Sequence, residues 1–418
     1  MLHIWLIQIG EPLPLNPEVR KMRTGLLAER LADRGHSVRW WASAFEHQRK
    51  VMAFERDEEH PLRDGLTLQI LRGCGYRRNI SLQRYLDHRL VARKFRAQAP
   101  ALPAPDAIVA SMPDHHLAWE AVRYARDRGI PVLVDIRDPW PDLFVDALPG
   151  RSLQALGRIV LAGDFRKLSA LLRGADGILA MSEGLLRWAL DKIPRPAGPT
   201  DRVFYMGYRK APPEPDLPAP PWFAGGKDLK RFVYVGTFGH SYDLGLILEA
   251  AKALLLDGRR DMQFILAGTG EQDAEMRHRA EALPNVVLPG WIGAGEIRAL
   301  LRSAWAGIVP GPMVTGALPN KIFEYLSAGL PLVSCLEGEM ADVIRRHGLG
   351  LNYRAGDLEG LLAALRTLAD SGSSRSEMAG NAAAFYQREG DADVIYDAYA
   401  HHVEKLAAAR LGPERIIR

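Results

Sequence analysis

The feature that most constrains the fold is a regular alternation of short apolar runs with longer Ala-, Leu- and Arg-rich stretches, interrupted once by prolines. The runs have the length of strands, and the stretches between them have the length of helices. This alternation is typical of a parallel sheet whose strands are joined by crossover helices. The proline-dense passage 212–221 has the composition of a stiff linker. We therefore predict two open α/β domains joined by that linker.

The expected boundaries follow from where the alternation stops and restarts. We predict a first domain at 1–205, a linker at 206–227, a second domain at 228–385 and a C-terminal helix at 386–418 that packs back on the first domain. Helices are expected near 19–34, 117–128, 152–173, 244–256 and 321–328, with a helical tail from 379 to 411. Strands are expected at 4–9, 37–42, 108–110, 132–136 and 177–180, and after the linker at 232–235, 262–267, 286–288, 307–310 and 332–335.

Composition places the chain among ordinary globular proteins. Its 418 residues suggest two or three domains, and 47% of them are apolar and 25% charged. No apolar run approaches the length of a membrane span, and the N-terminus has no signal-peptide pattern. Cys74 and Cys335 are the only cysteines, and their separation fits no metal-ligand spacing. We expect reduced thiols in a cytoplasmic protein, and no metal site.

The net charge of +4 is unevenly distributed. The segment 72–96 carries many cations against a single acid, Asp87, and aromatic and aliphatic residues are interleaved among them. Such a segment suits an anionic membrane surface, and we predict this partner rather than nucleic acid. A solvated helix with one buried stripe is the alternative. The cations are Arg72, Arg77, Arg78, Arg84, Arg89, Arg93, Lys94 and Arg96.

A second distinctive segment runs from Leu318 to Pro331. It opens with a Pro-Asn turn, places Lys321 and Glu324 three residues apart on a predicted helix, and ends at Gly329 and Pro331. A helix that begins with Asn320 and Lys321 suits an anion, because unpaired N–H groups and the helix dipole point there. Glu324, one turn on, is suited to accept hydrogen bonds from ribose hydroxyls. A solvated Lys–Glu pair is the alternative interpretation.

Three glycine-containing loops end successive strands of the second predicted sheet, so we expect them to converge with the Lys321 helix at one edge. None has the spacing of the dinucleotide fingerprint, and NAD binding is weakly supported. Glycine at a strand end permits close approach of the backbone to a phosphate or a sugar, although a plain tight turn also uses it. The candidate residues are Gly236, Thr237, Gly239, His240, Gly268, Gly270 and Trp291.

In the first domain, candidate residues also follow strands. Arg137 and Asp138 come directly after the run 132–136, and surface ion pairing is their alternative role. His115 and His116 follow the run 108–110, with a structural role as the alternative. The loop after the first strand supplies Gly10 and Glu11, and the next helix region supplies Arg20 and Arg23.

These motifs together resemble family 4 of the retaining nucleotide-sugar glycosyltransferases, in particular the members that build bacterial surface polysaccharides on lipid carriers. The resemblance rests on Val235–Gly239 with Tyr242-Asp243-Leu244, Leu266–Gly270, Leu288–Trp291, Pro319–Gly329, Arg34–Val38, Ser43–His47 and Asp135–Pro141. It implies the GT-B fold, in which two Rossmann-like, doubly wound parallel-sheet domains face each other across a cleft and a C-terminal helix crosses back.

The resemblance also implies roles. It implies a metal-independent and cofactor-free transfer of a sugar from a nucleotide diphosphate, UDP by default, to a lipid-linked or polysaccharide acceptor, on the inner face of the cell membrane. From their positions after strands and at a helix start, we expect Arg137, Asp138 and Lys321 to be catalytic, and acceptor binding is expected of Glu11, Arg20, Arg23, His115 and His116. Donor binding falls on Gly10, Gly236, Thr237, Gly239, His240, Gly268, Gly270, Trp291, Asn320, Lys321 and Glu324.

The chain departs from the family pattern at several positions. Gly316 stands where the family has the first glutamate of its Glu-x7-Glu motif, and Thr237 and Tyr242 stand where it has Arg and Lys. The usual catalytic-loop histidine is replaced within the segment 137–140. Two other functions therefore stay open, namely a catalytically degenerate binding or partner subunit and a sugar-nucleotide 2-epimerase. The basic segment 72–96 argues against a purely soluble epimerase.

Overall fold

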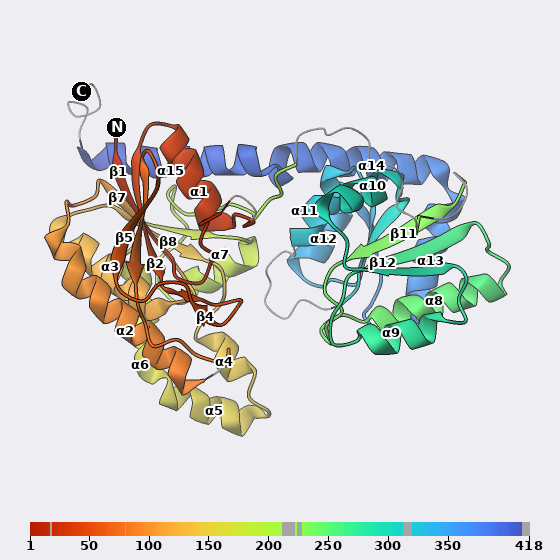
Figure 1. Ribbon diagram of the computed structural model, residues 1–418, viewed down its shortest axis with the longest axis horizontal. Helices are drawn as coiled ribbons and strands as arrows, with labels where there is room; N and C mark the ends of the chain where they lie inside the picture. The colour runs from red at the N-terminus through yellow and green to blue at the C-terminus, as the bar shows by residue number, and fades with distance from the viewer. Residues whose placement is uncertain (17–18, 80, 211–221, 224–227, 312–319, 412–418) are drawn as a thin grey trace. The chain divides into compact units, whose positions relative to one another are not determined.

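The computed structural model describes the chain except for residues 17–18, 80, 211–221, 224–227, 312–319 and 412–418 (Figure 1). The chain divides into two compact units. The first comprises Met1–Tyr205 together with Ile395–Arg418, and the second comprises Met206–Val394. Each is an α/β unit built on one largely parallel sheet, so the predicted fold class of two Rossmann-like, doubly wound domains is confirmed.

The sheet of the first unit has the strand order β10-β9-β8-β7-β1-β2-β6-β5. All its neighbours pair in parallel except β5 and β6. β1 and β7 lie at the centre of the sheet, and the later strands are added outward on both sides of them. Side chains that follow the central strands therefore meet at the carboxyl edge of the sheet. The strands are β1 His3–Ile7, β2 Ser37–Ser43, β5 Glu58–Arg63, β6 Leu66–Leu71, β7 Ala107–Ser111, β8 Val132–Ile136, β9 Gly177–Ala180 and β10 Arg202–Val203, and a small hairpin pairs β3 Phe45–Glu46 with β4 Val51–Met52.

Helices cover the first sheet, and aromatic rings fill part of its core. Trp5 of β1 stacks on Tyr124 of α3 and contacts Trp41 and Phe95 edge-on, with ring centroids 5.2–6.3 Å apart. Such pairs add to the free energy gained by burying the rings. The helices are α1 Arg23–Asp33, α2 Leu82–Gln98, α3 His115–Arg128, α4 Asp142–Asp146, α5 Arg151–Val160, α6 Ala162–Gly174 and α7 Glu183–Leu190.

Three predictions in the first unit were wrong in detail. The expected helix 152–173 is two helices, because the backbone at Leu161 leaves the helical conformation, with a ψ of 11°. Gly157 and Gly163, on either side of Leu161, weaken a continuous helix. The short strand β10 was not expected. Strands β3 to β6 were not expected either. Of these, β5 alternates half-buried and exposed residues and carries almost no apolar signal.

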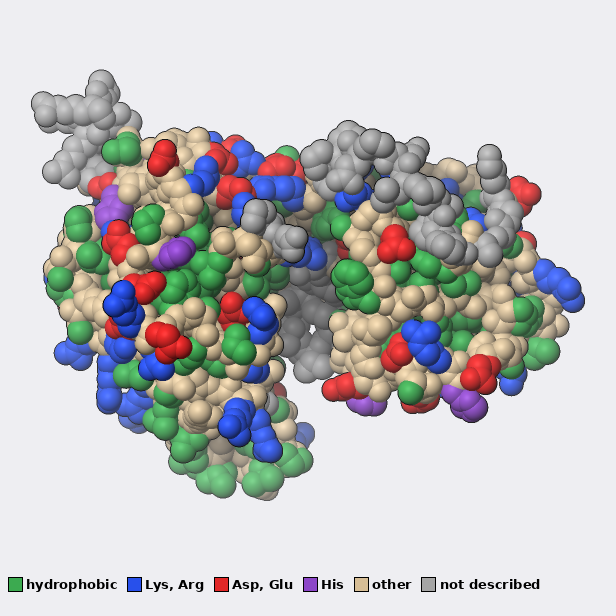
Figure 2. Space-filling view, viewed as in Figure 1, with side chains coloured by type: hydrophobic (Ala, Val, Ile, Leu, Met, Phe, Trp, Pro, Cys, Tyr) green, Lys and Arg blue, Asp and Glu red, His purple; other side chains and the backbone are tan. Residues whose placement is uncertain are grey.

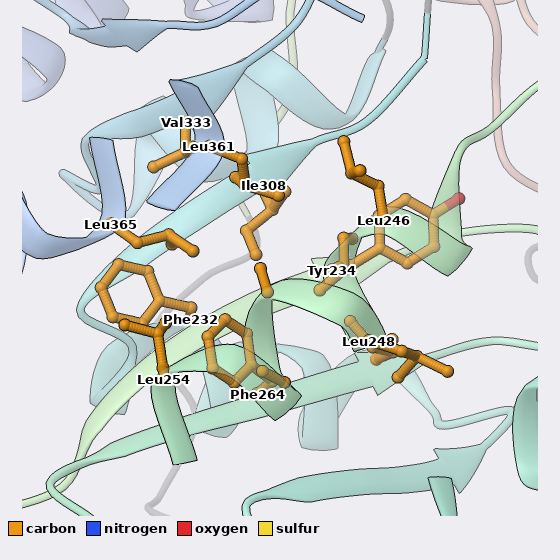
Figure 3. Packing of buried hydrophobic residues seen from close by; sticks show 14 of the residues in the cluster. Phe232, Tyr234, Leu246, Leu248, Leu254, Phe264, Ile308, Val333, Leu361 and Leu365 are labelled. Atoms are coloured by element: carbon orange, nitrogen blue, oxygen red, sulfur yellow. The ribbon is translucent and has the colours of Figure 1, made fainter. Parts of the chain in front are cut away.

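The second unit has a fully parallel sheet in the order β13-β12-β11-β14-β15-β16. Its central strands are buried on both faces, as their continuous apolar runs predict. Phe232 and Phe264 stack with centroids 5.7 Å apart at the centre of the core (Figure 3). The strands are β11 Lys230–Val235, β12 Met262–Ala267, β13 Val286–Gly290, β14 Ala306–Val309, β15 Leu332–Ser334 and β16 Gly350–Asn352, the last of which was not expected.

The helices of the second unit are α8 Leu244–Leu256, α9 Asp273–Ala280, α10 Ala294–Ser303, α11 Asn320–Ser327, α12 Glu339–His347, α13 Leu358–Asp370 and α14 Gly372–Phe385. The predicted helical tail is not continuous, because a π-helical turn at Tyr386–Gly390 separates α14 from α15 Ala392–Leu411. Within the described chain, no helix combines the length and the apolarity needed to cross a membrane.

Most of α15 belongs to the first unit. Arg34 at the end of α1 binds both carboxylate oxygens of Glu404, at 2.6 and 2.7 Å, and His36 lies 2.7 Å from the same carboxylate. Tyr399 stacks on Phe204 with centroids 4.7 Å apart. Burial alone would raise the pKa of Glu404. The hydrogen bonds and charges of Arg34 and His36 outweigh this effect and lower the pKa to about 2. The C-terminal helix thus packs on the first unit.

Candidate functional site

The expected convergence of loops in the second unit is present. A pocket of about 230 Å³ opens at the carboxyl ends of β11, β12 and β13, where parallel sheets usually bind ligands. Trp291, just after β13, is 78% exposed at its rim. The pocket is lined by Val235, Gly236, Thr237, Ala267, Gly268, Thr269, Trp291, Ile292 and Ile297.

Two glycines let the loops approach each other. Gly236 has a φ of 157° and Gly268 a φ of 150°, in a region that side chains rarely allow. A Cβ atom on Gly268 would lie 1.8 Å from the carbonyl oxygen of Gly236, and one on Gly236 would lie 2.8 Å from Nζ of Lys321. The strand end, the second loop and the lysine therefore sit against one another without room for a methyl group.

Lys321, in the first turn of α11, carries an ammonium that is buried between two tyrosine rings. Its Nζ lies 4.2 Å from the ring centroid of Tyr234 and 4.1 Å from that of Tyr242. This atom is buried and has no hydrogen-bond partner among the residues that the structure describes. Burial lowers the pKa of Lys321 to about 7, although the charge of Glu324 opposes the shift. Such an ammonium is suited to an anion that arrives from outside.

Hydrogen bonds fix the surroundings of this lysine. The backbone N–H of Val235, at the end of β11, donates to the Tyr325 hydroxyl at 2.8 Å, which ties α11 to the strand end. The Tyr234 hydroxyl donates to the carbonyl of Thr237 at 2.7 Å and so holds the loop that follows. Tyr242 stands where the resembling family has a cation, and here its ring lies against Lys321.

The other predicted donor-binding residues have fewer contacts with the Lys321 side chain and the pocket. His240 is largely exposed and lies 3.7 Å from the carboxylate of Glu271. The carbonyl of Gly239 accepts a hydrogen bond of 2.6 Å from Gln272. A Cβ on Gly270 would lie 2.6 Å from the carbonyl oxygen of Phe238, so this glycine permits a close turn. Glu324 is half-buried one turn after Lys321. Gly316 and the side chain of Asn320 lie outside the described structure.

In the first unit, Arg137 is held in a buried network of charges. Its Nε donates to Asp135 at 3.0 Å, and one Nη donates to the hydroxyls of Thr24 and Ser111 at 2.7 and 3.0 Å. The other Nη contacts the carboxylate of Glu11. Glu11 in turn accepts hydrogen bonds from the backbone N–H groups of Thr24 and Gly25. Arg137 is thus fixed by carboxylates and hydroxyls rather than held at the surface by an exposed ion pair.

Arg23 requires a correction. We expected it to bind the acceptor, but it is 1% exposed. Its guanidinium binds Asp135 in a forked arrangement at 2.8–3.2 Å and donates to the carbonyl of Phe204 at 2.6 Å. Because its N–H groups are taken up inside the unit, its role is structural. Arg20 is exposed just before α1.

Two further predicted residues stand at strand ends of this unit. Asp138 is half-buried, and burial raises the pKa of its carboxyl despite the charges of Arg84 and Arg137. Gly10 is exposed, and its N–H donates to the side-chain oxygen of Gln8 at 2.7 Å.

His115 and His116 also require a correction. Both are more than 95% buried at the start of α3, so the expected acceptor contact does not fit. Nε2 of His115 lies 2.8 Å from Asp164, and Nδ1 of His116 lies 2.8 Å from Nζ of Lys167. The two imidazoles and Asp164 offer ligand atoms within 4.8 Å of one another, a spacing that a metal ion could use. The Lys167 ammonium opposes this, because a metal-bound Nε2 needs Nδ1 to carry a proton.

A group of residues beside Gly10 was not predicted as a site. Arg84 of α2 lies with its Cζ 4.5 Å from the ring centroid of Trp140 and 5.4 Å from that of Tyr76. Its Nε lies 3.4 Å from His88, and it forms no ion pair with a described carboxylate. A narrow pocket brings Gly10 together with Tyr76, Arg84 and His88. The aromatic residues interleaved with cations in the segment 72–96 were the signal for this group.

Comparison with known proteins places these sites in context. Residues 229–371 match the family model described as glycosyl transferases group 1. No protein of curated function matches the chain. Among solved structures, the chain resembles Alr3699/HepE of Anabaena in complex with UDP, at 13% identity and a TM-score of 0.62, over 97% of this chain and 100% of that one.

Two further structures show the same likeness. Sucrose-phosphate synthase of Thermosynechococcus elongatus has 14% identity and a TM-score of 0.67, over 98% and 100% of the two chains. WaaG, a glycosyltransferase involved in lipopolysaccharide biosynthesis, has 15% identity and a TM-score of 0.59, over 96% and 99%. At such identities the likeness shows the fold. The protein therefore has the GT-B fold, and residues 229–371 of its second unit match the group 1 glycosyltransferase model.

Proposed function

We propose that this protein is a retaining glycosyltransferase that moves a sugar from a UDP-linked donor to a lipid-linked or polysaccharide acceptor. The observation that carries the proposal is the Lys321 ammonium, which is buried without a hydrogen-bond partner beside a pocket built from three strand ends. The family match over residues 229–371 and the UDP bound in the Anabaena structure support the same ligand class.

The proposed roles follow from charge and position. When the bond between the sugar and the diphosphate breaks, negative charge grows on the leaving oxygen, and a pre-positioned cation stabilises it. Lys321 and the N-terminus of α11 supply this stabilisation. Glu324 holds the ribose hydroxyls, and the exposed indole of Trp291 faces the base. Asp138, with its raised pKa, orients the acceptor hydroxyl, and Arg137 is fixed next to it in the chain.

The acceptor and the location are further parts of the proposal. The Arg84 guanidinium over Tyr76 and Trp140 offers a cation and apolar ring faces, which suit the phosphate and sugar groups of a lipid-linked acceptor. We place the protein in the cytoplasm, in peripheral contact with the anionic inner face of the cell membrane through the segment 72–96. Its helix α2 exposes Leu82, Leu86 and Leu90.

A thermal-shift panel tests the donor site. The wild type and the Lys321→Met variant are each titrated with UDP, GDP, UDP-sugars and GDP-sugars. A ligand that binds only the native state raises Tm with its concentration, so the best ligand identifies the donor. We expect UDP compounds to stabilise the wild type and to act weakly on the variant. Equal shifts in both proteins, or no shift with any nucleotide, would contradict the proposal. NMR of the product formed from the best donor then reports the anomeric configuration.

Tyr242 favours one alternative. Its ring lies against Lys321, at a position where the resembling family has a cation, which fits a degenerate subunit that binds a nucleotide sugar without transferring it. Tight binding of a UDP-sugar without release of UDP, with every lipid acceptor tried, would favour this alternative. A 2-epimerase would instead interconvert two nucleotide sugars in the absence of lipid.

A further inference from the structure

Helix α5, Arg151–Val160, is unusual in that none of its ten residues is buried. Four of them are large and apolar: Leu153, Leu156, Ile159 and Val160 are exposed by 46%, 54%, 72% and 73%. A surface helix of a globular protein normally buries its apolar side against the core. In the described structure, this helix leaves that side open.

The apolar residues of α5 form one stripe. Positions 153, 156 and 160 follow the three- and four-residue spacing of a single helix face, and position 159 lies beside them. The other residues of the helix include Arg151 and Arg158, and the sequence of α5 contains no acid. A helix with an apolar stripe and only cationic charges has the composition of one that lies in the surface of an anionic membrane.

A second helix of the same unit extends this surface. The Tyr85 hydroxyl of α2 lies 3.4 Å from Asp164 of α6, which follows α5 after one residue. The exposed apolar residues of α2 are accompanied by exposed Arg89, Arg93 and Arg96. Of the thirteen large apolar side chains that are exposed in the described chain, seven lie on α2 and α5. Figure 2 shows apolar side chains gathered near basic ones where Figure 1 places α5.

We propose that α5 inserts its apolar stripe into the interface of an anionic lipid bilayer, while the arginines of α2 and α5 contact the headgroups. This deepens the proposed function by naming the element that binds the membrane, and it does not depend on glycosyl transfer. A second copy of this chain fits the surface less well. A self-complementary contact would bring like charges together, and a ten-residue helix is small for a stable dimer.

The test uses the full-length protein and sedimentation with two kinds of vesicle, phosphatidylcholine alone and phosphatidylcholine with about one third phosphatidylglycerol. The variants are the double substitution Leu156→Glu with Ile159→Glu, and the matched control Leu256→Glu. Leu256 is 78% exposed at the end of α8 in the second unit. All three substituted side chains are exposed, so we expect Tm and the thermal shift with UDP-sugars to stay unchanged.

We expect the wild type and the control to bind the anionic vesicles, and salt to weaken this binding. The double variant should bind at least about tenfold more weakly, because two apolar side chains no longer leave water. The proposal would be overturned if the double variant bound the anionic vesicles as tightly as the wild type does. It would also be overturned if the wild type bound neither kind of vesicle. A wild-type dimer in light scattering that the double variant abolishes would assign the stripe to self-association instead. Because donor binding is measured separately, failure of membrane binding is distinguishable from failure of the proposed donor site.

Discussion

The two units each bury cations near the ends of their central strands, but they treat these charges differently. In the first unit, Arg23 and Arg137 share the carboxylate of Asp135, and Arg137 also contacts Glu11. In the second unit, the ammonium of Lys321 contacts two tyrosine rings and has no described hydrogen-bond partner. In the first unit the buried cations are paired with buried carboxylates, whereas in the second unit no described carboxylate is hydrogen-bonded to the Lys321 ammonium.

The pKa shifts express the same difference. Burial alone would raise the pKa of Asp135, but the charges of Arg23 and Arg137 hold it below its ordinary value. Burial lowers the pKa of Lys321, and Glu324 offsets only part of this effect. Buried charges that are matched inside the protein stabilise one conformation, and a buried charge that is unmatched is suited to a ligand. Four experiments test this difference between the two units.

The largest effect is expected for Asp135→Asn. This change leaves two guanidinium groups buried without their shared carboxylate, which should lower the free energy of unfolding by about 3–5 kcal/mol. The measurement is the denaturant midpoint at constant slope. The control is Asp261→Asn, which breaks the more exposed contacts with Lys230 and Arg259 and should cost about 1 kcal/mol or less. Equal losses in the two variants would refute the distinction.

Lys321→Met should weaken donor binding without lowering the free energy of unfolding. We expect the Kd of the best UDP-sugar to rise roughly a hundredfold, because a charge-assisted contact with the diphosphate is lost. The free energy of unfolding without ligand should stay the same or rise, because the variant no longer buries an ammonium. Calorimetric titration and a denaturant curve give the two values. A destabilised variant that keeps its donor affinity would place Lys321 with the structural cations.

The pH dependence of donor binding should be smaller than the effect of removing the lysine. The pKa of Lys321 is about 7 in the unliganded protein, and a diphosphate favours its charged form. Below pH 7 the lysine is already protonated, so the Kd should be nearly constant. Above pH 7 binding must first add a proton, and the Kd should rise by up to about tenfold per pH unit. Lys321→Arg should show a flat profile, and an equally flat wild type would argue against the unmatched charge.

The smallest effect is expected from metal removal. The ammonium of Lys167 occupies Nδ1 of His116, so His115, His116 and Asp164 should hold no tightly bound metal. Treatment with EDTA should leave Tm and donor binding unchanged, and added Zn²⁺ should not raise Tm. A stoichiometric metal in elemental analysis, lost together with stability on chelation, would overturn this expectation.

Local patterns predicted the fold class and most of its elements. The short apolar runs of β11 and β12, alternating with helical stretches, indicated buried parallel strands, and the glycine loops after them were therefore expected to meet at one sheet edge. The segment at Lys321 was correctly predicted as a helix because a Pro-Asn turn precedes it and a glycine and a proline end it. Strand β5 was not predicted because pairing with β6, rather than an apolar run of its own, makes it a strand.

Hydrophobic periodicity and glycine placement are local properties, and they were enough to predict the alternation of strands and helices and the position of Lys321 at the start of a helix beside the glycine loops. Contacts in the folded chain were needed to show that Arg23 is saturated by Asp135, that two histidines are buried against Asp164 and Lys167, and that α5 leaves its apolar stripe uncovered. Burial and charge pairing depend on contacts between residues as far apart as Arg34 and Glu404, which are separated by 370 positions. No local pattern records which of those contacts form.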